Sequence, residues 1–463
     1  ELIITDEQLS VRTNYFARLK GDVDGETPAS NWTDSKRFRI TGIQIMKQIQ
    51  PYEVKDTEVT IRWESNQDVT TVEAQPETEG TEPTPVGQPV VFNLTQTDID
   101  NAMLVLTDLQ PETSYMVDIF IGTKSVGFGS FKTMATTQYT TILNAGQDLN
   151  AAIAAAADGD VIGLNPGTYD ASGSNSVFDG KTVTVAALKK GVIVQPKEIN
   201  LNGTGAGAIF KDIEFDVQGS YFFNLTTPNG NGDDAAFTRL ELQNCVVHGT
   251  GNCVLRGDRG SESAFTIDTI LFENSIFYDN GNGYDYFSIR GVVFKTIELK
   301  NSTFYHVGRA FMGWGEDLSS PNADATILVD HCTFNDFGNS GRSYVLLDAG
   351  DNNVNFIFQN NIMANIPNVD ESLSAGTALT RLNGSGVMIT FTNNNIFNVT
   401  DGEDPPTNLE LPAGASTILN IDPGWDENTA WDTPSNDFSL PTGSVLRSAS
   451  TTGSYIGANR WAK

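Results

Sequence analysis

The chain has 463 residues, too many for one small compact core, so we expect two or three domains or one elongated repeat array. Its 39% hydrophobic and 10% aromatic content excludes wholesale disorder. Acidic residues outnumber basic ones by 58 to 28, a net charge of −30, which disfavours nucleic acid as a partner. A local basic patch could still hold an anion, because salt screens charges over roughly 8 Å.

Cysteine content and hydropathy narrow the class of protein further. Cys245, Cys253 and Cys332 cannot form a disulfide framework and lack zinc-site spacing, so we expect small buried side chains. No stretch approaches about 18 uninterrupted apolar residues, and the sequence begins ELIITDEQ. We therefore expect no membrane insertion, with any signal peptide or lipid anchor lying upstream. A secreted, cell-surface or periplasmic monomer fits these features.

The first 135 residues carry a repeated strand and turn signal. LQPETSY (109–115) lies between the alternating runs MLVLTD and MVDIFIG, which predicts two antiparallel strands joined by a turn. LSVRTNY (9–15) has the same spacing. A tyrosine after such a turn resembles the tyrosine corner of a β-sandwich, and with Trp63 the segment 39–135 resembles a fibronectin type III module. Residues 1–38 are then the C-terminal part of an earlier module, or alternatively extra strands docked on the second one.

The composition changes at about residue 139. QDLNAAIAAAA (147–157) predicts a short helix, and DVIGLNPGTY (160–169) predicts a strand that ends in a Pro-Gly turn. This succession resembles the N-terminal cap of right-handed parallel β-helices of the pectate-lyase and pectin-esterase kind. The resemblance implies an all-β chain in which residues 139–463 form a parallel β-helix solenoid behind a capping helix.

Six copies of one strand pattern favour a solenoid: LELQNCVV, ILFENSIF, IELKNSTF, ILVDHCTF, FIFQNNIM and ITFTNNNIF. Each repeat corresponds to one coil, and stacking of the coils buries the inward columns. The aligned positions are Asn244, Asn274, Asn301, His331, Asn360 and Asn394. Two residues earlier the inward column reads Leu242, Phe272, Leu299, Val329, Phe358 and Thr392. We interpret the asparagine column as a structural ladder of stacked amides rather than a ligand site.

A second strand follows in each coil, in the segments CVLRG, FSIRG, AFMGW, VLLDA and ALTRL. Their alignment predicts one column of Arg256, Arg290, Gly313, Asp348 and Arg381. Rungs lie about 4.8 Å apart, so Arg256 and Arg290 would stack as like charges. Carboxylates of Asp258, Asp285 or Glu262 could neutralise them as a structural feature. Alternatively, the arginines line a groove for sugar acids, because the guanidinium fork matches carboxylate or sulfate.

Turns beside these strands supply further candidates. Candidate substrate-binding residues besides those two arginines are Arg259, Tyr286, Arg309, Trp314 and Arg342. Glycines flank Trp314, which predicts either an open ring face for stacking on a sugar or a buried turn plug. Candidate catalytic groups are Tyr284, His306 and the same two arginines, although His306 could equally be a solvated turn residue.

The segment NGNGDD contains alternating oxygen donors, of which Asn229, Asn231 and Asp233 are candidate calcium ligands. It lacks the twelve-residue length and terminal glutamate of an EF-hand loop, so a flexible turn is favoured. We therefore expect no cofactor, with calcium as the one candidate.

The β-helix resembles the chondroitinase-B and alginate-lyase group of polysaccharide lyases. LQNC (242–245) and LRGDR (255–259) are similar to that group's Asn-Cys and Arg-x-Gly-Asp-His stretches. The resemblance implies calcium on a uronate carboxylate, proton abstraction by a lysine, and an arginine nearby that Arg256 matches to within one residue. Where the group has its lysine and acidic ligands, this chain reads GSYFFNLTTP (219–228), so the base and the ligand carboxylates are missing.

A second resemblance is to uncharacterised lyase-like β-helices of bacterial polysaccharide-utilisation systems, which follow fibronectin modules on secreted lipoproteins. The segments FSL (438–440) and IGANRW (456–461) carry it. We therefore expect binding of an acidic polysaccharide (alginate, pectin or a glycosaminoglycan) in a β-helix groove. One alternative is a lyase acting by β-elimination with its base moved to another residue. The other is a structural stalk or adhesin, in which carboxylates seal the arginines.

Overall fold

The computed structural model describes residues 14–18, 20–21, 30–33, 36–39, 42–80, 83–225, 235–257, 265–281, 283–315, 325–339, 343–373, 377–433 and 435–462. The chain divides into two compact units, and the boundary between them in the sequence lies between Thr137 and Gln138. Within the described ranges, every helix is too short or too polar to cross a membrane.

The N-terminal unit contains a β-sandwich with its own apolar core. One sheet pairs β3 with β6, and the other has the order β5-β4-β7-β8. The hydroxyl of Tyr115 accepts a hydrogen bond from the Gln110 amide at 2.9 Å, which closes the predicted tyrosine corner. The elements are η1 (Pro51–Glu53), β3 (Val59–Arg62), β4 (Thr71–Pro76), β5 (Val90–Asn93), α1 (Gln96–Asn101), β6 (Met103–Leu106), β7 (Ser114–Ile121) and β8 (Lys124–Lys132).

Ahead of the sandwich, β1 (Asn14–Ala17) pairs antiparallel with β2 (Lys36–Arg39). The boundary predicted at residue 38 therefore falls inside β2. Much of the segment 1–38 lies outside the described residues, so its assignment to a truncated module stays a prediction.

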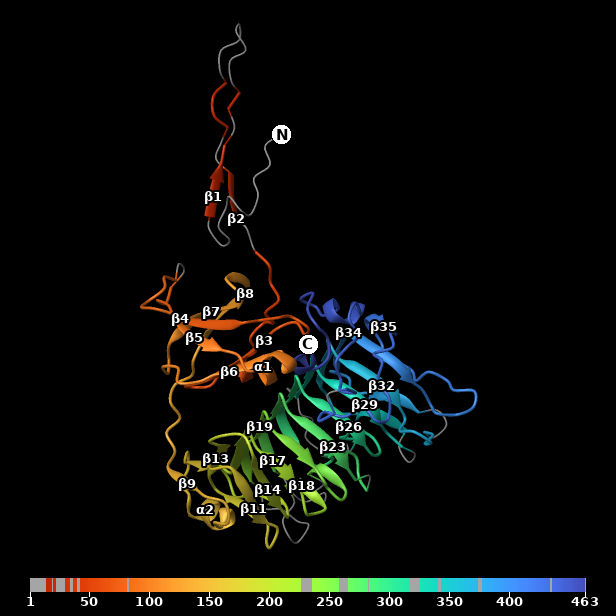
Figure 1. Ribbon diagram of the computed structural model, residues 1–463. Coiled ribbons are helices and arrows are strands. Elements are labelled where there is room, and N and C mark those ends of the chain that lie inside the picture. Colours follow the sequence, from red (N-terminus) through yellow and green to blue (C-terminus); the bar gives the residue numbers. More distant parts are fainter. Residues whose placement is uncertain are drawn as a thin grey trace. The chain divides into compact units, whose positions relative to one another are not determined.

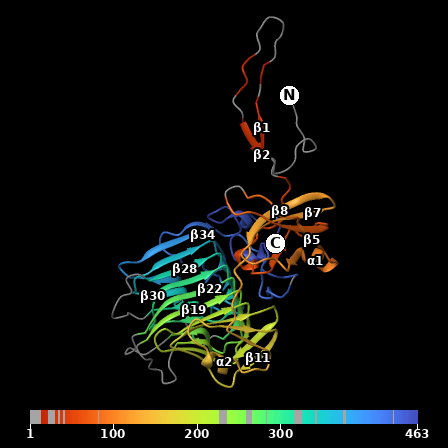
Figure 2. The same cartoon turned by 90° about the vertical axis from the view of Figure 1, so that its left-hand side faces the viewer.

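The C-terminal unit is a right-handed parallel β-helix, as the sequence predicted, with strands stacked rung on rung (Figures 1 and 2). The capping helix α2 (Leu149–Ala155) begins after Asp148, whose carboxylate accepts a hydrogen bond from the Ala151 amide. Its buried Leu149 and Ile153 join the solenoid core. The helix therefore covers the apolar end of the first coil, which has no preceding rung to bury it.

Three parallel sheets form the coils. The first sheet contains β9 (Thr141–Leu143), β10 (Val161–Leu164), β13 (Thr182–Ala187), β16 (Gly207–Lys211), β19 (Ala236–Gln243), β22 (Thr266–Glu273), β25 (Val293–Lys300), β28 (Thr326–Asp330), β31 (Asn355–Gln359) and the start of β34 (Met388–Val399). The second contains β11 (Gly167–Ala171), β14 (Val192–Pro196), β17 (Glu214–Asp216), β20 (Val246–His248), β23 (Ile276–Asn280), β26 (Thr303–Val307), β29 (Thr333–Phe337), β32 (Ile362–Ile366) and the end of β34. β35 (Ser416–Leu419) pairs with the middle of β34, from Thr392 to Asn395. The third contains β12 (Ser176–Asp179), β15 (Ile199–Asn202), β18 (Tyr221–Asn224), β21 (Cys253–Arg256), β24 (Phe287–Ser288), β27 (Met312–Gly313), β30 (Tyr344–Gly350) and β33 (Ala378–Leu382).

The predicted asparagine ladder forms the corner between the first and second sheets. The ladder residues from Asn244 to Asn360 adopt a left-handed conformation, with φ of 54° at Asn244 and 50° at Asn274, which asparagine tolerates better than most residues. Asn274 Nδ2 donates to Asn244 Oδ1 at 3.1 Å, and Asn244 Nδ2 donates to Asp212 Oδ1 at 2.5 Å. Asp212 is thus an additional rung that the alignment omitted. The column has structural bonds on these rungs, but the predicted ladder of amides is interrupted at Asn274, whose Oδ1 has no hydrogen-bond partner among the described residues.

The last rung of the predicted alignment is wrong by one residue. Gln359 pairs with Thr392, so Asn360 aligns with Asn393 and the inward residue is Phe391 rather than Thr392. Phe391 stacks on Phe358 with ring centroids 4.9 Å apart. Three consecutive asparagines left the sequence pattern ambiguous, whereas burial of an aromatic column selects one register.

A second, inward polar column follows the ladder at Cys245, Ser275, Ser302, Cys332, Asn361 and Asn394. The serine and asparagine side chains accept the amide hydrogen of the previous rung, as Ser275 Oγ does from Cys245 at 3.1 Å, whereas the Cys245 and Cys332 thiols donate to carbonyls. All three cysteines are buried free thiols, as predicted. Burial raises the pKa of Cys245 to about 12.

We expect the three thiols to react with a soluble disulfide reagent only after unfolding, because the protonated, buried thiol is a poor nucleophile. Counting reacted thiols per chain, first in buffer and then in denaturant, tests this. Rapid reaction of one thiol in buffer would contradict the burial of that column.

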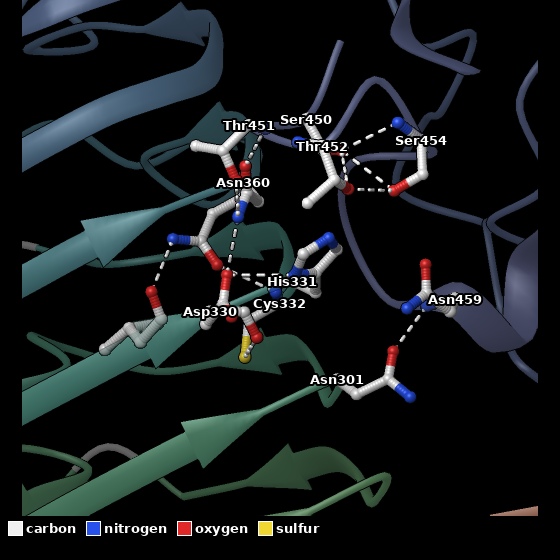
Figure 3. A network of polar contacts seen from close by, with 12 residues as sticks. Asn301, Asp330, His331, Cys332, Asn360, Ser450, Thr451, Thr452, Ser454 and Asn459 are labelled. Atoms are coloured by element: carbon white, nitrogen blue, oxygen red, sulfur yellow. Dashed lines mark hydrogen bonds and ion pairs between the residues drawn. The ribbon is translucent and has the colours of Figure 1, made fainter. Parts of the chain in front are cut away.

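The C-terminal segment 421–462 folds back over the second sheet. Its apolar side chains, among them Phe438, Ile456 and Trp461, form a core with the outward residues Ile276 and Tyr305. Figure 3 shows that it also covers the ladder, where the Thr451 and Asn459 amides donate to Asn360 Oδ1 at 2.8 Å and Asn301 Oδ1 at 2.6 Å. This segment contains η2 (Val445–Ser448) and η3 (Asn459–Trp461). The ladder is therefore unavailable to ligands along these rungs.

Candidate functional site

The column of polar residues on the third sheet differs from the predicted one. Arg256 pairs with Ser288, Ser288 with Gly313, Gly313 with Asp348, and Asp348 with Arg381. Arg290 lies two residues beyond Ser288, in the turn before β25. The predicted stack of Arg256 on Arg290 is therefore wrong. The two RG dipeptides suggested the alignment, but the inward pairing of Leu255 with Phe287 sets the register.

Arg256 lies between two tyrosine rings. Its guanidinium carbon is 4.8 Å from the ring centroid of Tyr221 and 5.3 Å from that of Tyr284. Arg256 Nη1 donates to the Tyr221 hydroxyl at 2.7 Å, while the buried Nε has no hydrogen-bond partner among the described residues. We call Tyr221, Arg256 and Tyr284 the arginine site. Cation–π contact orients this guanidinium without removing its charge.

A polar strip borders the arginine site on the preceding coils. Asn224 is the rung neighbour of Arg256, and its Nδ2 donates to Glu198 Oε2 at 2.9 Å. The ring centroids of Tyr221 and Tyr284 lie 6.0 Å apart. Burial raises the pKa of Tyr221 above its usual value despite the neighbouring Arg256 charge. At neutral pH the Tyr221 hydroxyl is therefore a neutral hydrogen-bonding group rather than a phenolate.

Arg309 and Asp285 form a separate, more enclosed pair. Asp285 is 2% exposed, and its Oδ1 lies 3.7 Å from Arg309 Nε. Arg309 Nη1 also donates to the Gly283 carbonyl at 2.7 Å. Gly313 makes room for the carboxylate, because a Cβ there would lie 2.1 Å from Asp285 Oδ2. Arg309 thus holds a buried structural carboxylate.

Arg381, two rungs beyond Gly313, is also neutralised. Its Nε and Nη2 donate to the two carboxylate oxygens of Asp348 at 2.7 and 3.0 Å, a bidentate pair. Its guanidinium carbon lies 5.1 Å from the Tyr344 ring. Arg309, in the turn before β27, and Arg381, on β33, therefore have carboxylate partners, whereas the described partners of Arg256 are phenol groups.

Two predicted substrate-binding aromatics are core residues. Trp314 is 0% exposed, packs on Phe294 with centroids 4.6 Å apart, and donates from Nε1 to the Val292 carbonyl at 2.9 Å. Tyr286 is also 0% exposed, and its hydroxyl accepts a hydrogen bond from Asn280 Nδ2. Of the two interpretations of Trp314, the buried turn plug is correct. Flanking glycines allow a close chain turn, and they do not by themselves predict exposure.

The remaining candidates are distributed over different regions. His306 lies on β26 in the second sheet, under the C-terminal segment, and not beside Arg256. Arg259, Arg342, Asn229, Asn231 and Asp233 fall outside the described residues, as do Asp258 and Glu262. Among the described residues, no group of three or more acidic, histidine or cysteine side chains could hold a metal ion. The structure thus brings Arg256 and Tyr284 together, and it adds Tyr221.

The sequence contained a signal for Tyr221. Its strand, YFFN, precedes CVLR by one coil, and Tyr221 pairs with Cys253 in the observed register. The lyase resemblance concerns the lysine and the acidic ligands that this segment lacks, and it says nothing about the tyrosine that the segment contains. The contribution of Tyr221 depends on a neighbouring coil, so the local motif around Arg256 could not reveal it.

Comparisons with known proteins give a limited result. The family profile described as "Domain of unknown function (DUF4957)" matches residues 167–307. A search of curated proteins gives no match. Among solved structures, a mutant of a PL6 family alginate lyase is similar over 71% of this chain, with a TM-score of 0.35 and 16% identity. The match spans 46% of that lyase chain, about half its length.

Proposed function

We propose that this protein binds an acidic polysaccharide on the outer face of the third sheet, where Arg256 contacts a uronate carboxylate or a sulfate group. The observation that carries the proposal is the environment of Arg256. In a chain with 58 acidic residues, its described partners are one phenol hydroxyl and two ring faces. A guanidinium that keeps its charge suits a bidentate anion.

The surrounding groups suit a sugar. Tyr284 is partly exposed beside the guanidinium, and its ring offers an apolar face to a pyranose. Asn224 and Glu198 add an amide and a carboxylate, which bond hydroxyl groups. Binding without cleavage fits the arginine site better than β-elimination, because the site lacks the lysine of the resembling lyases and its raised pKa keeps the Tyr221 hydroxyl protonated.

Affinity electrophoresis in gels that contain alginate, pectin or a glycosaminoglycan tests the proposal. We expect retention in at least one gel, and Arg256→Gln should weaken binding about fivefold to tenfold, since an exposed charged contact contributes roughly 1 kcal/mol. The wild-type affinity should fall with added salt more steeply than that of the variant. Arg239→Gln, an exposed arginine on the first sheet, is the matched control and should bind normally.

No retention of any acidic polymer would refute the proposal. The same polymers, followed by the ultraviolet absorbance of unsaturated uronates, distinguish binding from elimination. A rise in absorbance that Arg256→Gln abolishes would replace the binding function with a lyase. Carboxylate partners on Arg256 in a crystal structure, together with no glycan binding, would favour the stalk or adhesin.

We also propose that the sandwich is a fibronectin type III module that acts as a spacer, and that the protein works outside the cytoplasm. The tyrosine corner and the sheet order β5-β4-β7-β8 support the module assignment. The net charge of −30 disfavours adhesion of the chain to anionic lipid, which supports a role as a spacer and not as a membrane-binding module. Fractionation of the native cells, with antibody against this chain, tests the location.

A further inference from the structure

The segment 421–433, which we call the docking loop, is held on the second sheet by one side-chain donor from each of four rungs. Its carbonyl oxygens at Ile421, Trp425 and Asp426 accept from Asn395 Nδ2 at 2.8 Å, Asn365 Nδ2 at 3.2 Å and Asn335 Nδ2 at 3.0 Å. The fourth carbonyl, of Glu427, lies 2.8 Å from His306 Nε2. Three of these donors are amides, whose protonation does not change with pH, and the fourth is an imidazole.

His306 has a hydrogen-bond acceptor at each ring nitrogen. Nδ1 lies 3.0 Å from Asp279 Oδ1, and Nε2 faces the Glu427 carbonyl, with Asp336 Oδ2 3.6 Å away. A carbonyl oxygen and an ionised carboxylate can only accept, so both nitrogens must donate. A neutral imidazole has one N–H, whereas the imidazolium has two. The full set of contacts therefore requires protonated His306.

The groups around His306 favour that charge. Asp279 at the end of β23 and Asp336 on β29 flank it on the two neighbouring rungs, and Glu427 approaches from the docking loop. The Tyr305 ring packs edge-on against the imidazole at 4.9 Å, and Asp432 of the loop faces Tyr305. The hydrogen bond to Asp279 raises the pKa of His306 above its usual value, although burial opposes it.

We propose that His306 is a pH-sensitive latch, which holds the docking loop on the second sheet while the imidazole is protonated and releases it when the proton is lost. Because the pKa is raised in the closed state, the latch contributes fully below the ordinary histidine pKa of about 6.5 and is lost as pH rises through the raised value. The rest of the C-terminal segment stays bound, since Phe438, Leu446 and Trp461 remain packed in its apolar core. Trp425, near the start of the loop, packs on Phe438 in the same core with ring centroids 5.3 Å apart, so release is local to the part of the loop around Glu427.

Hydrogen exchange of peptides covering 421–433, measured on the full chain between about pH 6 and pH 9, tests the latch. After correction for the intrinsic exchange rate, we expect protection of the wild-type loop to fall with pH, by up to about tenfold per pH unit between the open-state and closed-state pKa values. Protection of peptides in the first sheet should not change. Constant protection of the loop across this range would overturn the proposal.

Two variants separate a latch from a merely structural side chain. His306→Asn keeps a residue suited to the left-handed backbone, φ 48°, which Asn365 and Asn398 adopt at the same corner. It should lower protection at pH 6 and remove the pH dependence. Asp279→Asn lets the new amide donate to an unprotonated Nδ1, so the loop should stay protected at pH 9. An unchanged pH dependence in either variant would contradict the latch.

His331→Asn is the matched control. His331 is also in the left-handed region, at φ 51°, and its Nδ1 faces the single acceptor Asp330 Oδ1 at 2.9 Å, which a neutral imidazole satisfies. Because the sequence has only three histidines, few other groups titrate in this range. The control should keep the wild-type pH dependence of the docking loop. Loss of that dependence would show that the titrating group is His331 in the ladder and not His306.

Discussion

Replacing Trp314 with alanine should lower the free energy of unfolding of the β-helix by about 3–5 kcal/mol while leaving glycan binding at Arg256 intact. The indole is fully buried against Phe294, and its Nε1 bonds the Val292 carbonyl. Truncation therefore leaves a large cavity and deprives a buried carbonyl of its donor. Urea unfolding followed by circular dichroism measures the effect.

Trp314→Phe is the control for this change, because it keeps most of the ring volume and loses only the hydrogen bond. It should cost about 1–3 kcal/mol. If Trp314→Ala unfolds like the wild type but no longer binds the glycan, the ring is an exposed sugar platform and the observed packing is wrong.

The second large effect is expected at Asn361, in the inward polar column. Its Oδ1 accepts from the Cys332 amide at 2.7 Å, and its Nδ2 donates to the Val329 carbonyl at 3.0 Å. The residue is 0% exposed, so water cannot replace either partner. Asn361→Ala should cost about 3 kcal/mol, mainly for the buried amide left without an acceptor.

The column itself supplies a rescue variant. Serine occupies it at positions 275 and 302, where Ser302 Oγ accepts from the Ser275 amide at 3.1 Å and donates to the Lys300 carbonyl at 2.8 Å. Asn361→Ser should therefore recover most of the lost stability in the same urea titration. Equal losses for the serine and alanine variants would show that volume, and not the amide acceptor, determines the effect.

Arg256, Arg309 and Arg381 differ in their partners, which their local sequence motifs do not reveal. Arg309 and Arg381 have carboxylates within 4 Å, whereas Arg256 lies against Tyr221 and Tyr284. A guanidinium paired with a carboxylate offers little net charge to a ligand, whereas a cation over a ring keeps its charge. For this reason the proposed binding site is built on Arg256 and not on Arg309 or Arg381.

The start of the β-helix and most of its register were predictable from the sequence, whereas the segment 421–462, predicted as part of the solenoid, folds back over the second sheet. A period of about one coil, aromatic inward positions and a corner residue suited to positive φ act locally on every rung, so the repeats Asn244 to Asn360 align correctly without tertiary information. The capping helix was equally local, because its N-cap and apolar face lie within one short segment. Free, buried cysteines followed from their number and spacing.

Only the tertiary structure decided the partners of each arginine, the burial of Trp314 and the covering of His306. Each depends on residues one coil or more away: Tyr221 lies 35 positions from Arg256, and Glu427 lies 121 positions from His306. The short third-sheet strands β24 and β27 have two residues each, too few for alternation to set a register. Sequence therefore determined the solenoid and its corners, because their pattern repeats, whereas packing between coils determined which polar residues remain open to a ligand.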